Sequence, residues 1–178
     1  GLFYPDTYVF IPGDTDFDIL RRAYVQFQTH LQQAWDNRDL SIPLKNPYEL
    51  LIMASIVEKE TGLAADRDNI AGVFMNRLKA NMLLQTDPTV IYGMGDKYEG
   101  RIRKVDLQTD TPWNTYTRKG LPPTPIANPS LAALEAASNP AEHGFYYFVS
   151  RGDGSSAFAK NLQEHNRNVR RFILKKGE

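Results

Sequence analysis

A short apolar stretch followed by two carboxyl groups is the part of this sequence best suited to acid–base chemistry. Projected at about 100° per residue, residues 50–57 are apolar in nearly every direction, which is typical of a buried helix. Glu58 and Glu60 come directly after them. A carboxyl group beside apolar neighbours has a raised pKa because desolvation disfavours its anion, and a raised pKa suits a general acid near neutral pH. The stretch therefore predicts a catalytic acid.

Helical spacing favours Glu58 over Glu60 as that acid. Ala54 and Ser55 lie on the side of Glu58, one turn back, and their small side chains would leave space for a ligand. Glu60 lies roughly opposite, beside Met53. A structural alternative stays open, in which both carboxylates lie past the buried part of the helix and pair with lysine or arginine.

Polar and aromatic residues in the later loops indicate what the acid would act on. They combine amides, hydroxyls and rings, and sugars need hydrogen bonds and apolar platforms together. The residues are Gln85, Thr86, Asp87, Tyr92, Trp113, Asn114, Thr115 and Tyr116. Thr86 and Asn114 also have a structural interpretation, because threonine and asparagine are common at caps and turns.

The sequence has no pattern typical of a metal or cofactor site. His30, His143 and His165 share no helix face, cysteine is absent, and no phosphate-binding glycine loop occurs. We therefore expect neither a metal nor a cofactor. His165 stays a candidate because it lies with Asn166 in a polar cluster on an otherwise packed helix, where substrate contact and structural hydrogen bonding are both open.

Composition excludes several other classes of protein. The 178 residues include 21 Lys and Arg against 21 Asp and Glu, and zero net charge argues against strong electrostatic binding of nucleic acid. The 11% aromatic content is too high for a disordered linker. A chain of this length forms one hydrophobic core, so we expect a single domain.

Local signals predict an α+β fold that is mainly helical, with a small antiparallel β element. Helix signals cover residues 16–36, 46–61, from 66, from 87, from 128, and 161–175. Residues 7–11 are predicted to form a short strand and residues 145–159 a hairpin. Residues 95–127 are predicted to form a long ordered loop with one short hairpin.

Several motifs in this sequence resemble those of the YceG-like endolytic murein transglycosylases, and they occur in the same order. The match covers nearly the whole chain. The motifs are Ala54-Ser55-Ile56-Val57-Glu58-Lys59-Glu60-Thr61, Val73-Phe74-Met75-Asn76-Arg77-Leu78, Leu84-Gln85-Thr86-Asp87-Pro88-Thr89-Val90-Ile91-Tyr92-Gly93, Asn114-Thr115-Tyr116, Gly120-Leu121-Pro122-Pro123 and Glu164-His165-Asn166. Thr124 departs from the pattern, since the family is expected to have glycine there.

The resemblance implies both an architecture and an activity. It implies a single lysozyme-like catalytic domain over residues 1–178. It also implies a LysM-like subdomain and a single-pass inner-membrane anchor outside this chain, with the domain facing the periplasm. The implied activity is that of a lyase that cuts peptidoglycan glycan strands between N-acetylmuramic acid and N-acetylglucosamine, leaves 1,6-anhydro ends, and trims or terminates nascent strands beside cell-wall synthases.

In the family motif the catalytic acid and base falls on Glu58. Substrate contacts are expected from Gln85, Thr86, Asp87, Tyr92, Asn114, Tyr116, His165 and Asn166. Two alternatives stay open. One is a hydrolytic muramidase that uses the same Glu58, and the other is a glycan-binding or scaffolding module in which Glu58 is structural.

Overall fold

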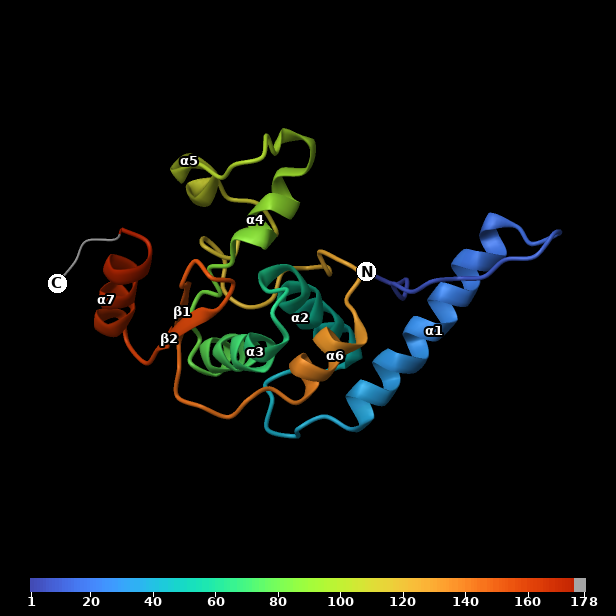
Figure 1. Ribbon diagram of the computed structural model, residues 1–178, viewed down its shortest axis with the longest axis horizontal. Helices are drawn as coiled ribbons and strands as arrows, with labels where there is room; N and C mark the ends of the chain where they lie inside the picture. Colours follow the sequence, from blue (N-terminus) through green and yellow to red (C-terminus); the bar gives the residue numbers. More distant parts are fainter. Residues whose placement is uncertain (175–178) are drawn as a thin grey trace.

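The centre of the molecule is a helix that is buried on all sides, α2 (Pro47–Glu60). The computed structural model describes residues 1–174. In it, α2 contacts α1 (Asp16–Asp36), α3 (Ala64–Lys79), α4 (Asp87–Met94) and α6 (Leu131–Ser138). Every residue from Leu50 to Val57 is buried, which confirms the helix predicted from the apolar stretch. Figure 1 shows α2 surrounded by α3, α6 and the loop before α6.

Side-chain caps set the helix starts close to the predicted positions. Thr15 and Asp18 form a reciprocal capping box at the start of α1, and Asn46 caps α2 with Pro47 in its first turn. Asn161 caps α7 (Leu162–Phe172). The helix predicted from residue 128 begins later, at Leu131, because Ser130 supplies the cap. Residue 175, the predicted end of α7, lies outside the described residues.

Within residues 1–174 the β structure is one hairpin, as predicted for residues 145–159. Strands β1 (Tyr147–Ser150) and β2 (Ser156–Ala159) pair antiparallel, with Phe148 opposite Phe158. β1 also contacts α3 and α7, so the hairpin joins the last helix to the core. The mainly helical α+β prediction is confirmed. Its lysozyme-like character stays a prediction.

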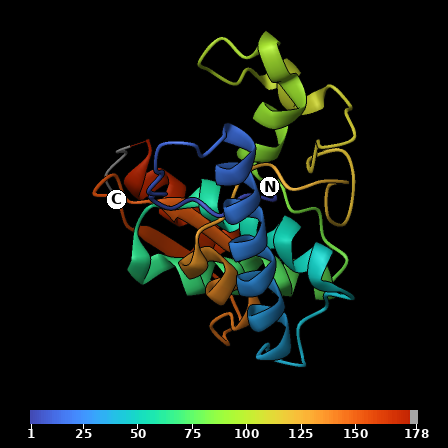
Figure 2. The same ribbon diagram turned by 90° about the vertical axis from the view of Figure 1, so that its right-hand side faces the viewer.

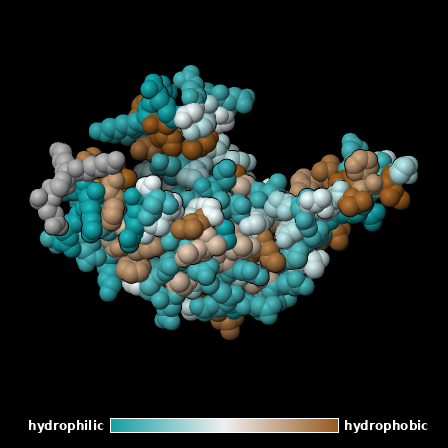
Figure 3. Space-filling view, viewed as in Figure 1, coloured by the Kyte–Doolittle hydropathy of each residue, from teal (hydrophilic) through white to brown (hydrophobic). Residues whose placement is uncertain are grey.

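The strand predicted at residues 7–11 is wrong. This segment has strong β propensity but no neighbouring strand, and side chains satisfy part of its backbone instead. Arg22 Nη1 donates to the Val9 carbonyl at 2.8 Å, and the Ile11 N–H donates to Asp14 at 3.1 Å. Residues 5–15 and the first half of α1 form an arm that projects from the core, and its apolar tip is visible in Figure 3.

The long loop prediction is partly wrong as well. Residues 95–127 contain a 3₁₀ turn, η1 (Gly95–Lys97), and a short helix, α5 (Lys104–Gln108), and no strand pairing occurs among the described residues of this range. Figures 1 and 2 both show α4, η1 and α5 standing off from the central helices. Residues 95–108 therefore form a projection beside the end of α2, whereas Trp113, Leu121 and Ile126 pack in or against the core.

Candidate active site

A groove of about 410 Å³ lies where the carboxyl end of α2 meets α3, the start of α4, β1 and α7. Its walls combine one carboxyl group from α2, one guanidinium from α3, amide and phenol groups, and aromatic surface. The lining residues are Glu60, Arg77, Leu84, Gln85, Asp87, Tyr116, Tyr147, Phe148, Leu162 and His165. The groove is therefore built from six separate parts of the chain, because Tyr116 comes from the segment between α5 and α6.

Glu60, and not Glu58, is the carboxyl group of α2 that faces this groove. Its Oε1 accepts a hydrogen bond from the Thr86 hydroxyl, while Oε2 has no hydrogen-bond partner within residues 1–174. Burial raises the pKa of Glu60 to about 7, and the negative charge of Asp87 acts in the same direction. The Thr86 hydrogen bond and the charge of Arg77 oppose that rise. A group with this pKa exchanges a proton readily near neutral pH.

Thr86 is fixed in place by a buried network of three threonines. The Thr86 N–H donates to the Thr115 hydroxyl at 3.0 Å, and the Thr89 hydroxyl donates to the Thr86 carbonyl at 2.8 Å. The hydroxyls of Thr89 and Thr115 are 2.8 Å apart. All three residues are buried. Thr86 therefore positions Glu60 from behind the groove and does not line it.

Arg77 places a buried positive charge in the groove without a carboxylate partner. It is 7% exposed, and none of the three ion pairs within residues 1–174 includes it. Its Nε donates to the Tyr146 carbonyl at 2.6 Å, and its Nη1 donates to the carbonyls of Leu83 and Leu84, each at 3.0 Å. These bonds tie α3 to the residue before β1 and to the segment before α4. Burial lowers the pKa of the Arg77 guanidinium.

Asp87 and Tyr116 form a hydrogen-bonded pair in the groove wall. The Tyr116 hydroxyl donates to Asp87 Oδ1 at 2.5 Å. Burial, and then the acceptance by Asp87, raise the pKa of Tyr116, so the phenol keeps its proton. Asp87 follows the N-cap of α4, where a carboxylate also interacts favourably with the helix dipole. The pair presents a negative charge near Glu60.

Gln85 has a strained backbone at the groove. Its φ of 51° lies in the left-handed region, which is uncommon for residues other than glycine. Its N–H donates to the Thr115 carbonyl at 3.1 Å, and its Oε1 accepts from Arg77 at 3.4 Å. Backbone strain of this kind is concentrated at functional sites.

The last helix closes one side of the groove with an aromatic surface. Leu162 and His165 of α7 line it together with Tyr147 of β1. The rings of Tyr147 and His165 stack with centroids 5.2 Å apart, and the Arg77 guanidinium lies 5.0 Å from the Tyr147 ring centroid. A flat aromatic wall beside hydrogen-bonding groups matches the chemistry of a sugar ring.

Glu58 has a structural environment. Its Oε2 accepts hydrogen bonds from the Ser130 N–H at 3.0 Å and from the Ser130 hydroxyl at 2.7 Å, at the start of α6. The expected space beside Ser55 is absent, because Ser55 is fully buried and its hydroxyl accepts from the Ile126 N–H at 2.9 Å. The premise that favoured Glu58 is therefore wrong.

Some of the remaining predicted residues line the groove, and another supports the loop beside it. Gln85, Asp87, Tyr116 and His165 line the groove. Asn114 is buried, donates to the Thr109 carbonyl at 2.7 Å and accepts from the Tyr116 N–H at 2.8 Å, so it shapes the loop.

Two other predicted contacts lie outside the groove lining. Tyr92 packs edge-on against Trp113, with centroids 5.5 Å apart, and Asn166 is exposed on α7. The sequence reasoning missed Arg77, Tyr147 and Leu162. Arg77 lay within one of the quoted motifs, whereas the hairpin and the start of α7 carried no chemical signal.

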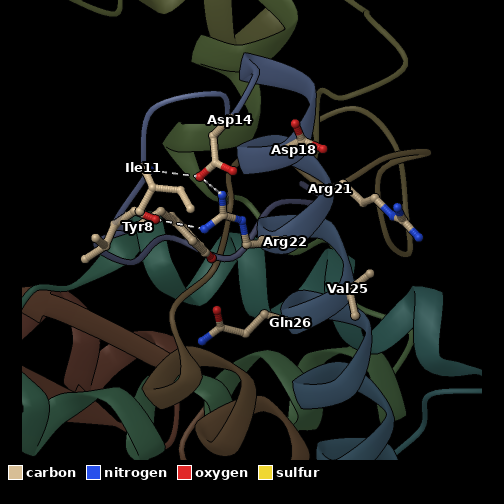
Figure 4. Close-up of a pocket in the computed structure, with 9 residues that line it drawn as sticks. Tyr8, Ile11, Asp14, Asp18, Arg21, Arg22, Val25 and Gln26 are labelled. Atoms are coloured by element: carbon tan, nitrogen blue, oxygen red, sulfur yellow. Dashed lines mark hydrogen bonds and ion pairs between the residues drawn. The ribbon is translucent and has the colours of Figure 1, made fainter.

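Two other hollows lack such a constellation. One lies within the arm, between residues 8–14 and the first half of α1. There Arg22 pairs with Asp14 at 2.5 Å and donates to the Val9 carbonyl (Figure 4). The other lies between α1, α3 and α6 and includes Arg67 and Glu135. The described part of the chain brings no three histidine or acidic side chains together as a metal cluster. Every helix within residues 1–174 is too short or too polar to cross a bilayer.

Comparisons of this chain with known proteins agree on one family. Residues 1–171 match the YceG-like family. A protein of Bacillus subtilis (strain 168) named endolytic murein transglycosylase is 39% identical over 178 residues, which are 100% of this chain and 49% of that protein. A protein of the same name from Streptococcus pneumoniae serotype 2 (strain D39) is 39% identical over 184 residues, covering 99% of this chain and 32% of that protein.

A solved structure gives the same result for the fold. The crystal structure of a YceG-like protein from Listeria monocytogenes has a TM-score of 0.82 and 37% sequence identity, and the match covers 94% of this chain and 54% of that one. The chain thus spans about half, or less, of the length of the relatives it matches.

Proposed function

Since the chain belongs to the YceG-like family, we propose that it cleaves peptidoglycan glycan strands as a lytic transglycosylase, with Glu60 as its acid and base. The observation that carries this proposal is the surroundings of Glu60: a carboxyl group with a pKa of about 7, one oxygen held by Thr86 and the other open to a groove with an aromatic wall. The names of the relatives support the substrate class.

The first chemical step is proton donation by Glu60. Its carboxyl proton passes to the glycosidic oxygen between N-acetylmuramic acid and N-acetylglucosamine as the bond to the anomeric carbon breaks. The acetamido group of the muramic acid residue stabilises the positive charge that develops at that carbon. Arg77 keeps the Glu60 carboxylate stable once the proton has left, since its charge favours the anion.

The second step returns the proton to Glu60. The carboxylate accepts a proton from the 6-hydroxyl of the same muramic acid residue, and the oxygen closes on the anomeric carbon to give a 1,6-anhydro end. The attacking hydroxyl is already part of the substrate, so the reaction gains the advantage of an intramolecular step. One carboxyl group serves both steps, whereas hydrolytic glycosidases commonly use two.

This assignment replaces the expectation that Glu58 is the acid. Glu58 accepts two hydrogen bonds from Ser130 at a helix start, an arrangement that indicates a structural role. Glu60→Gln is therefore expected to abolish cleavage.

The cellular setting is a proposal that rests on the family resemblance alone. It places the domain on the periplasmic side of the inner membrane, tethered by an anchor outside this chain, where it would trim or terminate nascent strands near cell-wall synthases.

Mass analysis of the products released from purified murein sacculi tests the activity. Fragments that are one water lighter than the corresponding reducing-end fragments support a transglycosylase. Fragments with reducing ends would instead indicate a muramidase, and binding without any fragments would indicate a glycan-binding module. Glu60→Gln protein serves as the inactive control.

A further inference from the structure

The imidazole of His165 is a polar group in the groove that the proposed reaction does not use. It projects from α7, stacks on Tyr147 and lines the same groove as Glu60. It makes no ion pair within the described residues. Its position beside the aromatic wall places it where a sugar ring resting on that wall would present its substituents.

The two ring nitrogens of His165 have different surroundings. Nδ1 is buried and has no hydrogen-bond partner within residues 1–174. Nε2 is also without a partner there but is not among the buried atoms, so it is the nitrogen open to the groove. A buried N–H without an acceptor is rarer than a buried acceptor without a donor. The ring proton therefore belongs on Nε2, where the groove supplies acceptors.

The surroundings of the imidazole favour its neutral form. Burial lowers the pKa of His165, and the positive charge of Arg77 lowers it further. A neutral ring offers one donor and no charge, so it does not pair with Glu60 or Asp87.

We propose that His165 is a substrate-recognition residue whose Nε2–H donates a hydrogen bond to an oxygen of the amino sugar bound on the α7 side of the groove. This inference rests on the proposed function, because it takes the occupant of the groove to be a glycan. Hydroxyl and acetamido oxygens are the acceptors such a sugar provides. Tyr147 orients the ring, and the buried Nδ1 fixes which nitrogen donates.

Replacing His165 with glutamine or with asparagine distinguishes the roles of its two ring nitrogens. Glutamine places its amide near the position of Nε2, and asparagine places it near the buried Nδ1. In a Glu60→Gln background, binding of a soluble tetrasaccharide of alternating N-acetylglucosamine and N-acetylmuramic acid is measured by calorimetry. We expect His165→Asn to weaken binding about 5- to 10-fold, the value of one hydrogen bond, and His165→Gln to stay within about 2-fold. Asn166→Ala, on the same helix, serves as a matched control that leaves binding unchanged.

Equal weakening by both amides would overturn the proposal, since it would mean that only the stacked ring matters. Unchanged binding by both would overturn it as well, while leaving the proposed function intact. A Glu60→Gln protein that binds no tetrasaccharide would overturn both proposals.

Nuclear magnetic resonance of the unmutated protein gives a test that no folding defect can obscure. The ¹⁵N shifts of His165 are expected to report a neutral ring protonated at Nε2, and a proton on Nδ1 would contradict the assignment.

Discussion

Two carboxyl groups placed two residues apart on α2 have different surroundings and different chemistry. Glu58 receives two hydrogen bonds at a helix start, whereas Glu60 receives one and lies against apolar surface and the charge of Asp87. Proteins give two carboxyl groups different roles by placing them in different environments. The residue types alone did not distinguish them, because the difference comes from Thr86, Asp87 and Ser130, which are distant in the chain.

Glu60 is expected to make the folded protein less stable as pH rises. Its folded pKa of about 7 lies above the unfolded value of 4.5, so the unfolded chain releases the proton first. Stability falls between those values, by up to about 3 kcal/mol. Glu60→Gln protein has no ionisable group at this position and does not lose this stability. The difference in unfolding free energy between the Glu60→Gln protein and the unmutated protein should therefore shift in favour of the variant from pH 5 to pH 8. Urea unfolding at several pH values measures it, and an advantage independent of pH would contradict the pKa.

Asp87 is expected to set the alkaline limit of activity. Its charge raises the pKa of Glu60, so Asp87→Asn should move the alkaline limb of the kcat/KM profile to lower pH. The matched control is Asp110→Asn, since Asp110 pairs with Arg118 at 2.7 Å and does not line the groove. An alkaline limb of the kcat/KM profile that is unchanged in Asp87→Asn would show that the charge of Asp87 does not affect the pKa of Glu60.

At the scale of elements, α2 contributes to the hydrophobic core, to the start of α6 and to the groove. Its buried face organises the core, Glu58 anchors the start of α6, and Glu60 enters the groove. The end of α2 therefore holds the N-cap residue of α6, Ser130, in place.

Glu58→Ala is expected to lower stability through the start of α6. It removes the acceptor of the Ser130 N–H and hydroxyl and a carboxylate from a helix N-terminus, at a cost of about 1–2 kcal/mol. The melting temperature should fall by several degrees while the specific activity of the folded protein is retained. Calorimetry measures the melting temperature and a cleavage assay measures the specific activity. Lost activity with an unchanged melting temperature would indicate that Glu58 is the catalytic acid.

Gly72 on α3 is expected to tolerate no side chain. A Cβ there would meet the Ala141 carbonyl oxygen and lie 2.6 Å from His143 Nε2. Gly72→Ala should therefore cost about 1–3 kcal/mol by overpacking the segment that leads into β1. Thermal unfolding measures the loss. Gly62→Ala is the matched control, because its Cβ would meet nothing within 4 Å.

The elements that could be predicted from the sequence were those with local signals. Caps such as Asn46 and Asn161 located helix starts, and the glycines around Asp153 located the hairpin turn. The segment at residues 7–11 misled because strand propensity says nothing about whether a partner strand exists.

At the scale of the whole molecule, the groove depends on contacts between distant segments. Thr86 meets Glu60 across 26 positions, and Arg77 meets Tyr146 across 69. The quoted motifs supplied Gln85, Asp87, Tyr116 and His165, but spacing along the chain could not show that Glu60 joins them and Glu58 does not. Only the packing of α2 against its neighbours decides which face of the helix opens to the groove.

The projecting arm is expected to contribute little to the stability of the domain. Val9 and Phe10 are 77% and 72% exposed, so they bury little apolar surface on folding. Val9→Ser and Phe10→Ser should each change the melting temperature by about 2 °C or less. Phe27→Ser, which removes a fully buried ring of α1, is the contrasting variant. A large loss from either arm substitution would mean that the arm packs against something in solution.

The most direct test compares Glu58→Gln with Glu60→Gln in one assay of glycan cleavage, with folding checked by circular dichroism. Both changes are nearly isosteric, and they lie on the same helix two residues apart. We expect Glu60→Gln to lose at least about 1,000-fold in rate, as removal of a sole acid and base implies, and Glu58→Gln to keep most of it. Near-normal cleavage by folded Glu60→Gln protein, with the loss falling on Glu58→Gln, would contradict the account.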